Sequence, residues 1–163
     1  MDKKRTDYER NARDLVSALA LHANMTWPSL LAMMEEIYGK PIELRPVADR
    51  NWKQVTGLLL DAGDRVLIYY RAEHTILYQV HNIFHEFGHI LLRDQGCKLS
   101  ESVTADDVFT LGIREGFQRA YANGLEFDKP ELVTNEQTAE AIAYEIARHL
   151  RTRPPTVQTE VFG

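Results

Sequence analysis

Apolar residues recur at the three- and four-residue spacing of an amphipathic helix in several segments of this chain. A helix buries the face that carries such positions, so each segment predicts one helix that packs against the rest of the domain. The predicted helices cover residues 7–22, 28–38, 75–93, 102–124 and 135–147.

A different pattern separates the second of these helices from the third. Residues 41–46 alternate like a short edge strand, with proline at both ends, where a missing N–H is tolerated. Residues 55–60 and 65–70 are rich in strand-forming residues, and residues 61–64 between them have the composition of a hairpin turn. We therefore expect an α+β fold in which a small antiparallel sheet packs with several helices.

Length and composition indicate a single domain. The chain has 163 residues, of which 44% are hydrophobic and 26% charged, as is usual for a globular protein with one core. We expect residues 1–151 to form this domain. Residues 152–163, which include Pro154 and Pro155, are expected to form a loose C-terminal tail.

Charge and hydropathy argue against two classes of partner. The net charge is −5, whereas holding a polyphosphate backbone requires clustered cationic surface. The charged first residues do not resemble a signal peptide, and no apolar run approaches the length of a membrane-spanning helix. The single cysteine, Cys97, excludes an internal disulfide. We expect a cytoplasmic protein that binds neither nucleic acid nor membrane directly.

The most informative motif lies in the helix predicted at residues 75–93. Residues 85–89 read His-Glu-Phe-Gly-His, which is H-E-x-x-H. His85 and His89 lie one turn apart on the same helix face, so both imidazoles can bind one metal ion. Glu86 can accept the proton of a water that the metal activates. The motif predicts a hydrolase that uses Zn²⁺, with Glu86 as its general base.

A hydrolytic zinc site usually has a third protein ligand. Glu136 and Glu140 lie one turn apart at the border of the apolar stripe of the last predicted helix, where a carboxylate needs a partner. Glu136 is closer to the middle of that stripe, which favours it as the third ligand, with Glu140 as the alternative. We expect Thr134 or Asn135 to cap this helix. Its expected core-facing residues are Ala139, Ile142, Ala143, Ile146 and Leu150.

The H-E-x-x-H motif and the later Glu136-Gln137-Thr138-Ala139-Glu140 segment together resemble the glutamate-zincin pattern. Over about residues 28–150, the chain resembles the ImmA/IrrE-type zinc metallopeptidases. The resemblance implies a minimal zincin-like domain in which His85, His89 and Glu136 bind zinc and Glu140 supports a ligand histidine. It also implies a regulatory metalloendopeptidase that cleaves a cytoplasmic protein such as a helix-turn-helix repressor. The interval between His89 and Glu136 is longer than in compact members of the family.

Two other interpretations use the same motif. In a non-proteolytic regulator, the metal would be structural or sensory and the domain would act by binding a repressor or an antitoxin. A purely structural site has no need of a base at Glu86, which argues against this interpretation. Peptide deformylases also have an H-E-x-x-H helix and use a cysteine as third ligand, but their cysteine precedes the motif. Cys97 follows it, so a loop thiol is the simpler interpretation.

Three further residues are weaker candidates. His81 lies one turn before His85 on the same face, where it can tune the site, although a histidine on a helix face is more often structural. Tyr144 and His149 are candidates for stabilising an oxyanion or assisting a leaving group. The edge strand of the sheet can hold a substrate peptide in an extended form. Two histidines and one carboxylate suit Zn²⁺, although Fe²⁺ or Mn²⁺ can use the same ligands.

Overall fold

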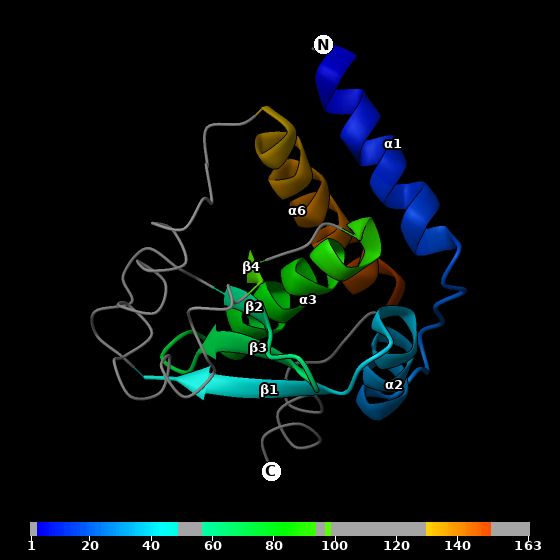
Figure 1. The fold of residues 1–163 in the computed structure, drawn as a ribbon. Coiled ribbons are helices and arrows are strands. Elements are labelled where there is room, and N and C mark those ends of the chain that lie inside the picture. Colours follow the sequence, from blue (N-terminus) through cyan, green and yellow to red (C-terminus); the bar gives the residue numbers. More distant parts are fainter. Residues whose placement is uncertain (1–2, 49–56, 94–96, 99–129, 151–163) are drawn as a thin grey trace.

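The computed structural model describes residues 3–48, 57–93, 97–98 and 130–150 of the chain (Figure 1). The helix expected at residues 102–124 and the expected tail at residues 152–163 lie outside these ranges. The described part is an α+β structure. Its elements in chain order are α1 (Lys3–Ser17), α2 (Trp27–Tyr38), β1 (Ile42–Val47), β2 (Gly57–Asp61), β3 (Val66–Arg71), α3 (Ile76–Leu92), β4 (Cys97–Lys98) and α6 (Pro130–Leu150).

The sheet is mixed, and the expectation of a purely antiparallel sheet is wrong. Strands β2 and β3 form the expected antiparallel hairpin, but the strand order is β1-β3-β2-β4. Strand β1 pairs in parallel with β3, where Leu44 is opposite Ile68, and β4 pairs in parallel with β2. The hairpin places β2 on the far side of β3, so β1 meets β3 rather than its neighbour in the chain. Cys97 lies in strand β4 rather than in a loop.

Helix α3 lies between the sheet and α6 (Figure 1). It contacts β2, β3, α2 and α6, whereas α1 packs on α6. Ile83, Phe84 and Phe87 of α3 are fully buried in this core. Burying a side chain of this size contributes roughly 2 kcal/mol to stability, so these three residues fix α3 firmly against its neighbours. None of the described helices is long and apolar enough to cross a lipid bilayer.

The sequence placed α3 correctly and the start of α6 incorrectly. Helix α3 covers Ile76–Leu92 after Thr75, although the Thr75 side chain makes no capping hydrogen bond. Helix α6 begins at Pro130, before the caps expected at residues 134 and 135. Proline is favoured in the first turn of a helix, where its missing N–H has no intrahelical partner in any case. The core-facing stripe expected for this helix is confirmed, because all five of its residues are buried.

Asp61, the last residue of β2, connects the sheet to the end of α2. Tyr38 donates a hydrogen bond of 2.9 Å to Oδ2 of Asp61, and Lys40 Nζ lies 2.8 Å from both carboxylate oxygens. Burial raises the pKa of Asp61, but the hydrogen bonds from Lys40, from the Gly63 backbone and from Tyr38 outweigh it and lower the pKa. Burial and the contact with Asp61 raise the pKa of Tyr38 to about 12.

Candidate metal centre

Helix α3 supplies two of the side chains that form the candidate metal centre. His85 and His89 are one turn apart, and their Nε2 atoms are 3.2 Å from each other. The ring centroids are 4.9 Å apart, with the rings nearly perpendicular. Both side chains are largely buried, with exposed fractions of 19% and 12%. Two basic nitrogens at this separation require a proton or a cation between them.

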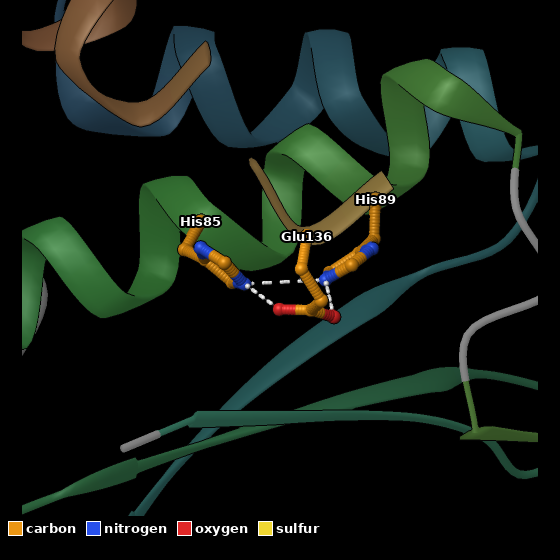
Figure 2. Close-up of side chains that lie close together, drawn as sticks. All are labelled: His85, His89 and Glu136. Atoms are coloured by element: carbon orange, nitrogen blue, oxygen red, sulfur yellow. Dashed lines mark hydrogen bonds and ion pairs between the residues drawn. The ribbon is translucent and has the colours of Figure 1, made fainter. Parts of the chain in front are cut away.

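Helix α6 supplies the third side chain. Figure 2 shows the carboxylate of Glu136 lying against both imidazole rings. Its Oε2 is 3.1 Å from Nε2 of His85, and its Oε1 is 3.1 Å from Nε2 of His89. The structure therefore brings together His85, His89 and Glu136, whose ligand atoms form a group that could hold a metal ion.

The separations of these atoms fit the size of a zinc site. Zinc binds imidazole nitrogen and carboxylate oxygen at about 2.0–2.2 Å in tetrahedral geometry, which places neighbouring ligand atoms about 3.3 Å apart. Here the Nε2 atoms of His85 and His89 are 3.2 Å apart, and each lies 3.1 Å from a different oxygen of Glu136. With one ligand atom taken from each residue, the three atoms lie within 4.8 Å of one another, a spread that one metal ion could bridge. Three protein ligands also leave a fourth position for water or substrate, as catalytic sites require.

The charges in the site are complementary. Burial lowers the pKa of His85, but the hydrogen bond to Glu136 and the nearby Glu86 carboxylate raise it, and the net shift is upward. The hydrogen bonds from His85 and His89 hold the pKa of Glu136 well below its usual range. Glu136 is therefore ionised at neutral pH and ready to accept a cation. Its side chain is 55% exposed, so it borders on solvent.

A close approach of the two helices explains how Glu136 reaches the histidines. A Cβ atom added to Gly88 of α3 would lie 2.8 Å from Cα and 2.9 Å from the carbonyl oxygen of Ala139 in α6. Because real Cβ atoms do not approach backbone so closely, only glycine allows this packing at residue 88. Residue 88 precedes His89, and Ala139 is one turn after Glu136. Sequence reasoning did not use Gly88, although a glycine inside a helical pattern is a signal of close packing.

Glu140 lies beside the metal centre rather than in it. Its Oε2 accepts a hydrogen bond of 3.0 Å from Nδ1 of His85, and its Oε1 lies 2.8 Å from Nε2 of His81. Nε2 of His85 remains directed at Glu136. The structure thus gives different partners to the two glutamates that the sequence left as alternatives. Glu136 belongs to the group that could hold a metal ion, whereas Glu140 contacts Nδ1 of His85 from outside that group.

Glu86, the expected general base, is buried between α3 and the sheet. The residue is 6% exposed. A Cβ atom added to Gly57, the first residue of β2, would lie 2.9 Å from Oε1 of Glu86. The missing side chain at residue 57 therefore leaves room for this carboxylate. Gly57 is a residue that sequence reasoning missed, since a single glycine before an apolar run has many structural explanations.

The remaining candidates do not join the three-residue group. The Tyr144 side chain is exposed, and its ring lies 4.9 Å from the His81 ring. Nδ1 of His149 donates a hydrogen bond of 2.8 Å to the carbonyl oxygen of Glu145, within α6. Cys97 belongs to β4, in register with Leu60 of β2.

Comparison of the chain with protein-family models, with curated proteins and with solved structures finds no match.

Proposed function

We propose that this chain is a zinc-dependent metallopeptidase with His85, His89 and Glu136 as metal ligands. The observation that carries the proposal is the convergence of His85, His89 and Glu136, whose ligand atoms lie within 4.8 Å of one another, with Glu86 buried on the same helix. A site with two histidines and one carboxylate is typical of zinc hydrolases. Zinc, when bound, supplies Lewis-acid activation of water and of the substrate carbonyl group.

Under this proposal, a residue of the chain transfers the proton during hydrolysis. Glu86 accepts a proton from the attacking water and passes it to the leaving amine. The carboxylates of Glu136 and Glu140 contact histidines, and Glu86 is the carboxylate within the H-E-x-x-H motif, so we assign this step to Glu86.

Strand β2 offers a place for an extended peptide close to Glu86. Its last residues, Leu60 and Asp61, pair with β4. Residues 57–59 pair with β3 on one side, and no described strand pairs with them on the other. An extended segment can add to such an edge through backbone hydrogen bonds. Gly57 would bring the backbone of that segment next to the general base.

The proposed substrate is a cytoplasmic protein, and a helix-turn-helix repressor is the first to test. This choice is based on the resemblance of the H-E-x-x-H and Glu136–Glu140 segments to ImmA/IrrE-type peptidases. Under the same proposal the chain acts in the cytoplasm as a regulatory protease.

Metal content tests the ligand set. Elemental mass spectrometry of the purified chain, after zinc is supplied and excess removed, should give about one zinc per chain. Glu136→Ala should lose the metal, whereas Glu140→Ala should retain most of it. Absence of bound zinc in the wild type would overturn the proposal, and equal loss in both variants would overturn the assignment of Glu136 as the ligand.

Glu86→Gln tests proteolysis separately. This variant should bind zinc normally and fail to cleave a co-encoded repressor or a peptide library that the wild type cleaves. A chain that binds zinc and the repressor but cleaves nothing, with Glu86→Gln indistinguishable from wild type, would support the non-proteolytic regulator instead. Activity that persists in Glu86→Gln would remove Glu86 from the mechanism.

A further inference from the structure

A second group of polar side chains lies one helical turn before the metal centre. It consists of His81 of α3 and Glu140 of α6, together with the ligand His85. Oε1 of Glu140 is 2.8 Å from Nε2 of His81, and Oε2 is 3.0 Å from Nδ1 of His85. One carboxylate therefore contacts two histidines of α3, one through each oxygen.

The hydrogen-bond chemistry of this group assigns its protons when the ring of His85 is neutral, which is the form that can bind a metal. An ionised carboxylate only accepts hydrogen bonds, so Nε2–H of His81 and Nδ1–H of His85 are the donors. A neutral imidazole with its proton on Nδ1 has its lone pair on Nε2. Nε2 of His85 is the atom that faces Glu136 and His89. Glu140 therefore selects the tautomer of His85 that can bind a metal.

Glu140 needs a second anchor to do this. Its side chain is 45% exposed, and a glutamate bordering on solvent has rotamer freedom that one hydrogen bond does not remove. His81 is better buried, with an exposed fraction of 23%. The His81 ring also packs at 4.9 Å against Tyr144, one turn after Glu140 on the same helix. Burial and the contact with Tyr144 therefore position His81 independently of Glu140, so that His81 can restrain the Glu140 carboxylate.

We propose that His81 is a positioning residue of the metal centre: it holds Glu140 in the rotamer that orients His85, and it thereby raises the affinity for zinc. This inference rests on the metal centre of the proposed function. The role is indirect, because His81 contacts Glu140 and contributes no atom to the three-residue group.

Two substitutions of His81 separate its hydrogen bond from its ring packing. His81→Phe keeps a ring against Tyr144 and removes the donor. His81→Gln removes the ring and places an amide N–H near the position of Nε2. Zinc affinity is measured by competition with a chromophoric chelator for wild type, both variants, Glu140→Ala and the double variant His81→Phe/Glu140→Ala. Circular dichroism verifies that each variant is folded.

Loss of the hydrogen bond should weaken zinc binding through Glu140. Glu140→Ala is expected to reduce affinity about 10- to 100-fold, and His81→Phe about 3- to 10-fold. His81→Gln should remain within about twofold of wild type, since it retains the donor. In the Glu140→Ala background, His81→Phe should have no further effect, because the residue through which it acts is gone.

Four results would overturn the inference. In a wild type that binds zinc, unchanged affinity in His81→Phe would show that Glu140 needs no such anchor. An equal loss in His81→Phe and His81→Gln would show that the hydrogen bond is not the cause. A loss by His81→Phe of the same size in the Glu140→Ala background would show that His81 acts independently. A wild type that binds no zinc would overturn the metal centre itself, and the inference with it.

Discussion

Gly88 of α3 lies against Ala139 of α6 so closely that a side chain at residue 88 has no room. The nearest atoms to an added Cβ are backbone atoms of Ala139, at 2.8 and 2.9 Å, followed by its side chain at 3.1 Å. Backbone cannot turn aside as a flexible side chain can. The contact therefore sets the distance between the helix that carries the two histidines and the helix that carries Glu136.

Replacing Gly88 by alanine should push the two helices apart. Overpacking costs about 1–3 kcal/mol, and the better helix propensity of alanine offsets about 1 kcal/mol, so we expect a net loss of up to about 2 kcal/mol. Zinc affinity should fall at least about tenfold, because a small displacement disrupts a three-ligand site. Urea unfolding and chelator competition measure the two effects. Adding Ala139→Gly should not restore binding, since the closest clashes are with backbone, and full recovery in that double variant would contradict this explanation.

Replacing Gly57 by alanine should affect hydrolysis more than metal binding. The added Cβ would meet Oε1 of Glu86 at 2.9 Å, and the end of that side chain can move away. We expect zinc affinity close to wild type and at least about a tenfold loss of cleavage rate, because proton transfer needs a positioned carboxylate. The assay compares cleavage of a peptide library with zinc content in the same preparation, with Glu86→Gln as the reference. A variant with unaltered cleavage would remove Gly57 from any role in placing the base.

The stability of the metal-free protein and its affinity for zinc should respond to pH in opposite directions. The pKa of His85 is raised above its usual value, so its contribution to stability is fully present below about pH 6.5 and is lost as pH rises through the raised pKa. Zinc requires the unprotonated ring, so binding strengthens over the same range. Melting temperatures from pH 5.5 to 8.5, measured with chelator and with zinc, should diverge as pH rises. Glu136→Gln should weaken the first trend, and parallel curves in the wild type would refute the coupling.

Replacing Asp61 by asparagine should loosen the link between α2 and β2. The carboxylate accepts hydrogen bonds from Tyr38, Lys40 and the Gly63 backbone. Disrupting hydrogen bonds to a charged group lowers the free energy of unfolding by about 1–3 kcal/mol. The pKa of Asp61 is lowered in the folded chain, so its contribution is present above about pH 4 and is lost as pH falls through the lowered value. Urea unfolding at pH 7 and pH 3 should show a smaller acid effect in the variant.

Asp64→Asn is the matched control for that experiment. Asp64 lies in the same turn, but its side chain is 70% exposed and pairs with Arg65 at the surface. Surface ion pairs contribute little, so this variant should unfold nearly as the wild type does at pH 7. Equal destabilisation by the two variants would mean that the turn as a whole, rather than the contacts of Asp61, determines the effect.

Much of the metal centre could be predicted from the sequence because it depends on the geometry of one helix. The spacing of His85 and His89 fixes their relation wherever α3 lies. The choice between Glu136 and Glu140 depended on how α6 meets α3, which the helical angle could only suggest. Burial does not separate the two, since both side chains are about half exposed. Their partners on α3 separate them: Glu136 contacts the two histidines of the motif, and Glu140 contacts His81 and His85.

The sheet shows where local sequence reasoning ends. The hairpin of β2 and β3 could be predicted because its turn and both strands are contiguous. The parallel pairing of β1 with β3 joins residues such as Ile42 and Val66, and nothing near either residue specifies that neighbour. The same limit applies to Gly57 and Glu86, whose proximity follows from the packing of α3 on the sheet.

Because its ligands come from two helices, the proposed metal ion would crosslink α3 and α6 as well as take part in catalysis. His85 and Glu136 are 51 residues apart in sequence, and an ion bound to both would close that length of chain into a ring. A covalent crosslink around a loop of this size restricts the unfolded chain by about 4 kcal/mol, which gives the scale of the effect. Helix α1 packs on α6, so the N-terminal helix is attached to the segment that the ion would fasten. Removing the metal would thus leave α6, and α1 packed on it, attached to α3 by the buried contacts of their apolar faces alone.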